Sequence, residues 1–235
     1  MDSIDFQRSK SLNIVPKRKI DSIIESIRSS KDDLKTQSTL INAINKYAES
    51  NIPIEYWRLS MDKHFQGDKR LLAKYKEYTS DLKKAFLNGE SFCLCGSHGL
   101  GKSLVHCCIL KEAVLKNYTC LYTTLSDIVN VLLLASSEEK FLARRELTLV
   151  DFLVIDEFDS RFMPTEAASD LYARSLEGIF RTRVQNHLPT LMATNSPNIL
   201  NALSGPMQQS MGSLMKGYLK MFPVLGSDFR EKKQQ

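Results

Sequence analysis

The chain contains 235 residues, of which 43% are hydrophobic and 25% charged, and its formal net charge at pH 7 is +5. This composition is that of a soluble globular protein, and the length fits one α/β domain with a small appendage. No apolar run approaches the roughly 20 residues of a membrane-spanning helix, and the polar N-terminus lacks the apolar core of a signal peptide. We therefore expect a cytoplasmic protein without a membrane partner. The mild positive charge permits contact with nucleic acid but does not require it.

The N-terminal fifth of the chain is predicted to be helical. Residues 1–16 are polar and are expected to be loosely ordered. Residues 20–27 and 38–49 carry apolar side chains at helical spacing, which predicts two short amphipathic helices. Two such helices bury too little surface to form a stable domain alone. They either pack back on the main domain or bind a partner protein, and we assign residues 1–51 as a partner-binding region.

The rest of the chain, residues 52–235, is predicted to form one α/β domain. Strands are expected at 91–95, 118–123, 149–157, 190–195 and 222–225, and helices at 71–88, 104–116, 127–134, 170–186 and within 198–222. Ser126 or Thr124 is expected to cap the helix that follows it, and the charged stretch 136–148 is helical or irregular. Helices that alternate with buried apolar strands specify a parallel sheet with helices on both faces.

All five cysteines fall on predicted strands and helices between residues 93 and 120. Zinc sites usually place Cys-x₂₋₄-Cys pairs in loops, so buried small hydrophobic side chains are favoured over metal ligands. The odd number of cysteines and the expected intracellular location argue against disulfides.

The glycine-rich stretch 96–103, Gly-Ser-His-Gly-Leu-Gly-Lys-Ser, constrains function most strongly. It lies between a predicted strand and a predicted helix, and it matches the pattern G-x-x-x-x-G-K-[ST] of loops that bind nucleotide phosphates. Its glycines let backbone N–H groups turn toward a phosphate, and the helix N-terminus adds positive potential; they are Gly96, Gly99 and Gly101. We expect Lys102 to reach the outer phosphates of ATP and Ser103 to bind Mg²⁺.

Polar residues end two further predicted strands. Asp156 and Glu157 follow a continuous apolar run, and Asn195 ends the next strand. In a phosphate-loop domain, Asp156 would help to hold Mg²⁺, and Glu157 would orient or deprotonate the attacking water. Asn195 would reach the γ-phosphate or that water. The alternative interpretation is that each of these residues is a solvated turn residue. Because three strand ends converge on one edge of the sheet, the functional interpretation is favoured.

A series of motifs covers residues 52 to 231. In order they are Ile52-Pro-x-x-Tyr56, the glycine loop, Tyr122-Thr-Thr-x-x-Asp127, Leu153-Val-Ile-Asp-Glu157, Pro189-Thr190 through Thr194-Asn195, and Gly226-Ser-Asp-Phe-Arg230. This combination resembles the AAA+ ATPases of the DnaC helicase-loader group, with the IstB transposition ATPases as close relatives. The resemblance implies Walker A residues Lys102 and Ser103, Walker B residues Asp156 and Glu157, sensor 1 Asn195 and sensor 2 Arg230.

The resemblance also implies ring or spiral homo-oligomers with ATP between neighbours, in which one subunit inserts an arginine into the next site. This sequence departs from that pattern, because no arginine lies between Asn195 and Arg230. Lys216, Arg181 and Arg183 are the candidates for a trans-acting cation. Lysine lacks the planar guanidinium fork, so we expect slow hydrolysis or a cation from elsewhere.

Three functions follow from these observations. The leading one is an ATP-dependent loader that binds a replicative DNA helicase through residues 1–51 and single-stranded DNA through its ATPase oligomer. Phe141 with Lys140, Arg144 and Arg145 are candidates for that DNA surface, although core packing of Phe141 and a solvated face for the arginines are favoured. The alternatives are an IstB-like ATPase that binds duplex DNA and a transposase, and an adaptor that binds ATP with little hydrolysis.

Overall fold

The structure is a computed structural model that describes residues 9–12, 14–162, 166–202, 205–226 and 228. Its helices are α1 (Lys17–Arg28), α2 (Leu34–Glu49), α3 (Met61–His64), α4 (Lys69–Ser80), α5 (Leu82–Leu87), α6 (Lys102–Leu115), α7 (Leu125–Leu134), α8 (Ser137–Leu149), α9 (Glu166–Gln185) and α10 (Gly205–Tyr218). Its strands are β1 (Ser91–Cys95), β2 (Cys120–Thr124), β3 (Phe152–Asp156), β4 (Thr190–Thr194) and β5 (Leu219–Pro223).

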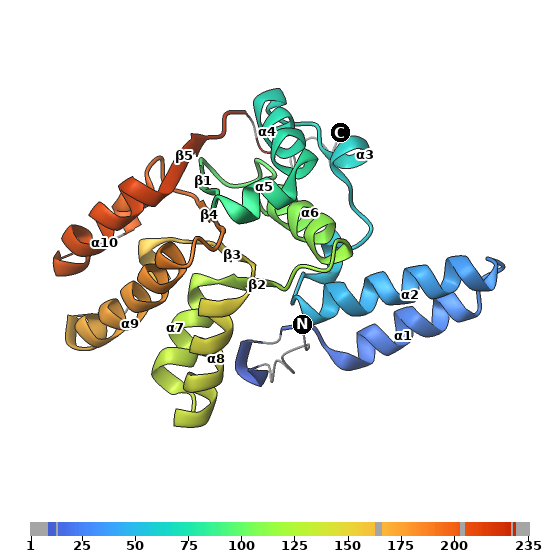
Figure 1. Ribbon diagram of the computed structural model, residues 1–235, viewed down its shortest axis with the longest axis horizontal. Helices are drawn as coiled ribbons and strands as arrows, with labels where there is room; N and C mark the ends of the chain where they lie inside the picture. Colours follow the sequence, from blue (N-terminus) through green and yellow to red (C-terminus); the bar gives the residue numbers. More distant parts are fainter. Residues whose placement is uncertain (1–8, 13, 163–165, 203–204, 227, 229–235) are drawn as a thin grey trace.

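In the described part of the chain, the strands form one sheet in the order β2-β3-β4-β1-β5, and every neighbouring pair is parallel. Strands β1, β3 and β4 are buried along their whole length, as apolar runs covered on both faces should be. Because successive side chains point to opposite faces, Cys93 packs with α7–α10 and Leu94 with α4–α6. The predicted parallel sheet between two helical layers is confirmed (Figure 1).

The helix predicted over residues 71–88 is divided into α4 and α5. Asp81 interrupts it with a backbone φ of −138°, and its carboxylate accepts a 2.9 Å hydrogen bond from the Lys84 N–H. This bond caps the N-terminus of α5, because it satisfies an N–H group that has no partner within the helix. Apolar side chains of both helices still reach the same core.

The strand predicted at 222–225 is β5, which begins three residues earlier because it pairs with the whole length of β1. Helix α7 is capped by Thr124 and not by Ser126. The Thr124 hydroxyl accepts from the Asp127 N–H at 3.1 Å, and the Asp127 carboxylate accepts from the Thr124 N–H at 3.3 Å. This reciprocal pair is a capping box. The charged stretch 136–148 forms α8.

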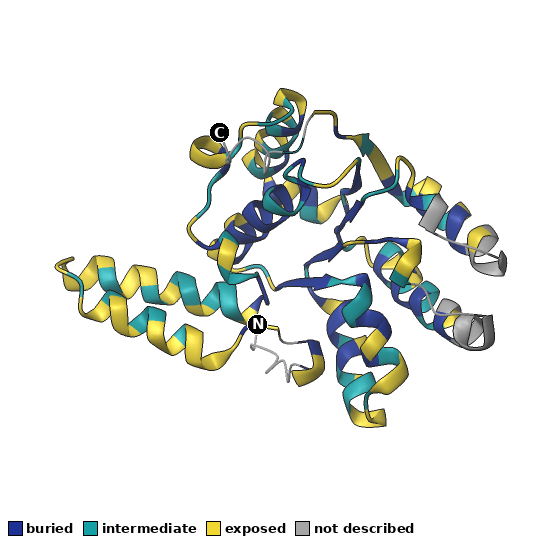
Figure 2. Cartoon of the chain, turned by 180° about the vertical axis from the view of Figure 1, so that it is seen from behind, coloured by how far each residue is buried: buried dark blue, intermediate teal, exposed yellow. Residues whose placement is uncertain are grey.

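Helices α1 and α2 form a hairpin that extends away from the body (Figure 1). Neither helix contains a buried residue, and Figure 2 shows the hairpin as largely exposed. The partly buried side chains of Tyr47 and Ala48, near the end of α2, pack against the core cluster that includes α6. The base of the hairpin thus packs back on the body, while its far end presents its surface to solvent.

Residues 9–12 are held against the body and are not the loosely ordered segment expected over 1–16. Leu12 is 1% exposed within the core cluster that includes α7 and α8. The Ser9 N–H donates to the buried Glu146 carboxylate at 3.2 Å. Residues 1–8 and 13 lie outside the described residues.

Among the residues that the structure describes, no helix is both long and apolar enough to cross a bilayer. The five cysteines are all described, all buried and all free thiols. Their burial on β1, β2 and α6 agrees with their interpretation as small hydrophobic side chains.

Candidate nucleotide site

The predicted phosphate loop connects β1 to α6 at the edge of the sheet where β3 and β4 also end. It bends through the left-handed region, with φ of 72° at Gly99 and 80° at Gly101, the residue that precedes α6. A Cβ atom at Gly96 would lie 2.6 Å from the carbonyl oxygen of Val224. The loop therefore requires glycine. It leaves the N-terminus of α6 at the site, where backbone N–H groups attract anions.

Lys102 is the first residue of α6 and is 7% exposed. Its Nζ donates to the carbonyl oxygens of Gly96 and Ser97, both at 2.7 Å, and to Oδ1 of Asn195 at 3.0 Å. This last bond joins the loop after β1 to the end of β4, as the parallel sheet predicts. The three acceptors are neutral oxygens, and a phosphate oxygen is a stronger acceptor for an ammonium group. Lys102 thus suits a phosphate ligand.

Asp156 ends β3 and is 3% exposed. Its Oδ2 accepts from the Tyr122 hydroxyl and its Oδ1 from the Glu157 N–H, each at 2.8 Å. Burial and the Asp156 charge raise the pKa of Tyr122 well above its usual value, so the hydroxyl stays protonated and donates. Glu157 itself is exposed, with φ of 50°. A positive φ is uncommon for a residue with a side chain, and such strained residues cluster at functional sites.

The donor set at this edge fits a magnesium nucleotide. The Asp156 carboxylate and the Ser103 hydroxyl offer oxygen ligands, which Mg²⁺ prefers alongside phosphate oxygens and water. Lys102 and the N-terminus of α6 offer positive charge and N–H donors for the phosphates themselves.

The sequence matches no protein-family model and no curated protein. Solved structures do match its fold. DnaI superposes with a TM-score of 0.58 over 75% of this chain and 93% of that chain, at 18% sequence identity. The DnaC helicase loader superposes with a TM-score of 0.54 over 74% of this chain and 100% of that chain, at 17% sequence identity. The replication initiator DnaA, bound to AMPPCP and single-stranded DNA, superposes with a TM-score of 0.57 over 78% of this chain and 56% of that chain, at 18% sequence identity.

This chain has the fold of an AAA+ ATPase. The likeness covers about three quarters of the chain, so the resemblance to DnaC-type ATPases is confirmed at the level of the fold. Within this fold the proposed Walker A lysine and sensor 1 asparagine are in direct contact, through the bond between Lys102 and Asn195. Arg230, expected as sensor 2, lies outside the described residues.

Arg183 does not suit the expected role of a cation that reaches the site of a neighbouring subunit, which corrects its place among the candidates. It is 0% exposed. Its guanidinium donates at 3.1, 2.9, 2.7 and 2.9 Å to the carbonyls of Leu147, Val150 and Pro189 and to the hydroxyl of Thr190. Burial lowers its pKa to about 10. Arg181 and Lys216 are exposed and stay candidates.

Two further residues adjoin the phosphate loop, and the sequence assigned no role to either. The carboxylate of Asp228 lies against Gly99, where a Cβ atom would be 1.9 Å from its Oδ1. His106 lies one helical turn after Lys102 and is fully buried, and neither ring nitrogen has a hydrogen-bond partner among the described residues. Burial lowers the His106 pKa to about 4, so the ring is neutral at pH 7. Asp228 belongs to the Gly226-Ser-Asp-Phe-Arg230 motif, which is a sequence signal for this position, whereas His106 belongs to none of the motifs and only packing reveals it.

The sequence favours core packing for Phe141, and the structure shows that this prediction is wrong. Its side chain is 66% exposed, because α8 turns Ala143 and Leu147 toward the core and Phe141 away from it. Arg144 is exposed, as the solvated-face interpretation predicts. An exposed aromatic beside cations is compatible with the stacking of unpaired bases.

Proposed function

We propose that the chain is an ATP-dependent loader of a replicative DNA helicase. The observation that carries the proposal is the direct contact between Lys102 and Asn195, beside the acidic end of β3, in a fold like those of DnaI and DnaC. Phosphate-binding, metal-binding and water-orienting groups thus share one edge of the sheet.

In this proposal Lys102 and the loop glycines bind the phosphates of ATP, and Ser103 and Asp156 hold Mg²⁺. Mg²⁺ neutralises charge on the transferred phosphoryl group. Glu157 accepts a proton from the attacking water or orients it, and its exposure leaves the carboxylate accessible. Asn195 would exchange its bond with Lys102 for one to the γ-phosphate or to that water.

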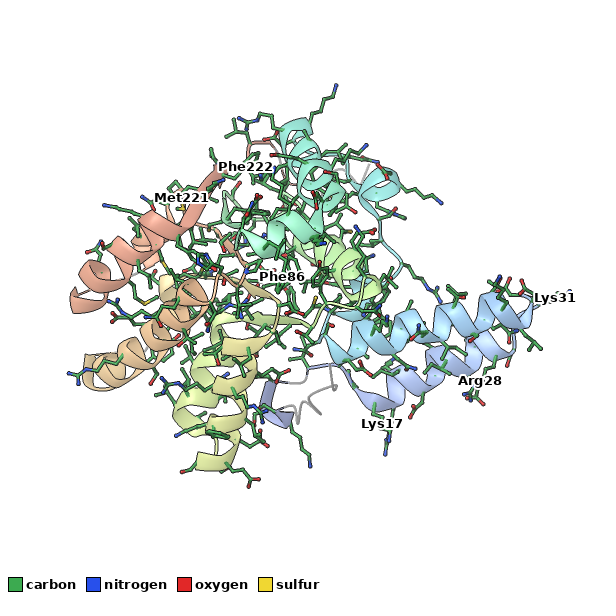
Figure 3. All side chains as sticks on the ribbon, in the orientation of Figure 1. Lys17, Arg28, Lys31, Phe86, Met221 and Phe222 are labelled. Carbon is green, nitrogen blue, oxygen red and sulfur yellow. The ribbon has the colours of Figure 1, made fainter. Side chains whose placement is uncertain are left out.

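The α1–α2 hairpin is the proposed helicase-binding element. It lies within residues 1–51, which we propose as the partner-binding region. A hairpin with no buried residue exposes its surface to a partner. Figure 3 shows Lys17, Arg28 and Lys31 along it, and Leu34, at the start of α2, is 84% exposed. Charges of both signs flank Leu34, with Asp32 and Asp33 before it and Lys35 after it. An exposed leucine within a charged rim fits a partner that offers an apolar contact point.

The proposed oligomer is a ring or spiral that binds single-stranded DNA. Exposed Phe141 and Arg144 on α8 support a strand-binding surface. DnaA, which shares the fold, is bound to single-stranded DNA in its structure. Lys216 or Arg181 would supply the trans-acting cation.

The helicase role predicts a complex that depends on the hairpin. Leu34→Asp is expected to weaken the affinity for the cognate hexameric replicative helicase about tenfold or more, because it places an unpaired charge at the apolar contact point of the interface. Leu134→Asp, at an equally exposed leucine on α7 (81%), is the control and should bind as wild type. Size-exclusion chromatography and titration with labelled helicase measure the two affinities.

Wild-type protein that never co-elutes with the helicase, with or without ATP, contradicts the proposal. In a DNA-binding assay, a preference for duplex over single-stranded DNA favours the IstB-like alternative.

The burial of Arg183 favours one second candidate, an adaptor that binds ATP with little turnover, because it removes an arginine from the possible trans-acting groups. The loader predicts that Glu157→Gln lowers ATP hydrolysis about a hundredfold or more while nucleotide affinity persists, since a general base contributes on that order. Phosphate release and equilibrium binding measure the two quantities. Near-zero hydrolysis in wild type, unchanged by Glu157→Gln, would establish the adaptor.

A further inference from the structure

Tyr122, on β2, contacts Asp156 at the end of β3 through its side chain and the segment after α2 through its backbone. Its side chain is 5% exposed, and its hydroxyl donates to Asp156 Oδ2 at 2.8 Å. A carboxylate has about four lone-pair positions, so Asp156 keeps acceptor capacity beyond the bonds from Tyr122 and Glu157. The Tyr122 hydroxyl therefore orients the carboxylate without preventing it from holding a metal or its water.

The backbone of Tyr122 carries the base of the α1–α2 hairpin. The Tyr122 N–H donates to the carbonyl of Ser50 at 2.9 Å, and the Asn51 side-chain amide donates to the Tyr122 carbonyl at 2.9 Å. Ser50 and Asn51 directly follow α2. The same Asn51 side chain donates to the carbonyl of Leu12 at 2.6 Å and accepts from the Ile14 N–H at 2.8 Å. One residue thus ties both ends of the hairpin to β2.

The hairpin base is otherwise incompletely packed against the body. A cleft of about 390 Å³ lies between them, lined among others by Lys17, Ile20, Ala48 and Leu121. The base also packs through Tyr47 and Ala48 on the core cluster of α6 and bonds to Asn117 through Lys46. Two of its directed bonds, those of Ser50 and Asn51, reach the backbone of Tyr122. Tyr122 is therefore the described residue whose backbone contacts the hairpin joint and whose side chain contacts Asp156.

We propose that Tyr122 is a positioning residue that orients Asp156 for Mg²⁺ and couples it to the α1–α2 hairpin. A partner that moves the hairpin would change the affinity of the site for magnesium nucleotide. Bound nucleotide would then change the affinity of the hairpin for that partner by the same factor. This inference rests on the proposed function, because it assumes that the site binds a magnesium nucleotide.

The first test measures equilibrium affinity for a fluorescent, non-hydrolysable ATP analogue over a range of Mg²⁺ concentrations, in the full chain. Tyr122→Phe is expected to raise the Mg²⁺ concentration for half-maximal affinity about tenfold, as the loss of an outer-shell partner of a metal ligand does. Affinity in EDTA should be unchanged. Tyr78→Phe is the matched control, because its hydroxyl donates to the Glu90 carbonyl at 2.8 Å, away from Asp156.

The second test perturbs the joint. Asn51→Gly keeps a backbone with φ of 57° and removes the side-chain bond to β2 together with the bonds to Leu12 and Ile14. We expect a shift of about threefold in the same Mg²⁺ midpoint. In the Tyr122→Phe background Asn51→Gly should add nothing. Asn117→Gly is the control, because this asparagine has φ of 65° and contacts α2 through Lys46 without touching Tyr122.

The outcomes separate the inference from the function on which it rests. Equal Mg²⁺ midpoints in Tyr122→Phe and Tyr78→Phe overturn the role of the hydroxyl. Equal shifts in Asn51→Gly and Asn117→Gly, or an Asn51→Gly shift that persists in Tyr122→Phe, overturn the coupling. Wild-type protein that binds no nucleotide with Mg²⁺ overturns the proposed function itself.

Discussion

Lys102→Ala is expected to abolish nucleotide binding while the chain stays folded. The ammonium group is the one side-chain cation that the phosphate loop directs at the site, and its present acceptors are loop carbonyls and Asn195. Truncating one partner of a desolvated charge pair costs about 3 kcal/mol or more, which lowers affinity at least about a hundredfold. The fold should persist, because Lys102 belongs to neither core cluster and its replacement by alanine leaves both clusters intact.

Isothermal titration with MgATP measures this loss, and circular dichroism reports the fold. Lys116→Ala is the control, because Lys116 lies at the other end of α6 and is exposed. Wild type and Lys116→Ala should gain thermal stability with MgATP, since a ligand that binds the native state stabilises it. Normal nucleotide affinity in Lys102→Ala would refute the site assignment as a whole.

Arg183→Leu is expected to lower the free energy of unfolding by about 3–5 kcal/mol. Two effects oppose each other. Burial of the guanidinium is unfavourable, as its lowered pKa indicates, and leucine removes that cost. The substitution also leaves four buried acceptors without Arg183 as donor, and each bond to a charged group contributes about 1.5–3 kcal/mol. The bonds prevail, because two of the carbonyls lie at the C-terminal end of α8, where the helix dipole favours a cation.

Urea unfolding measures the difference, with Arg181→Leu as control. Arg181 lies two residues earlier on α9 and forms an exposed ion pair with Glu177 at 2.6 Å, so its loss should change stability by about 0.5 kcal/mol at most. An Arg183→Leu protein as stable as Arg181→Leu would show that the four bonds contribute little beyond the desolvation that they offset.

The sequence by itself determined the parallel sheet, the phosphate loop and the strand ends at which the site residues lie. These features are local: a short apolar run predicts a buried strand, and the glycine spacing predicts a loop that opens a helix. The meeting of the strand ends required one further rule, that carboxyl ends of parallel strands share an edge. The structure accordingly places Lys102 in contact with Asn195.

Only the tertiary structure decided which side chains of these elements face each other. Arg183 lies on a predicted helix and is 0% exposed, whereas Phe141 lies on a predicted charged stretch and is 66% exposed. The way in which α9 and α8 pack against the sheet selects which face of each helix is buried. The bond from Tyr122 to Asp156 spans 34 residues and the bond from Asn51 to Tyr122 spans 71. Such pairings leave no periodic signal in the sequence, since they arise from strand order and from the path of the chain after α2.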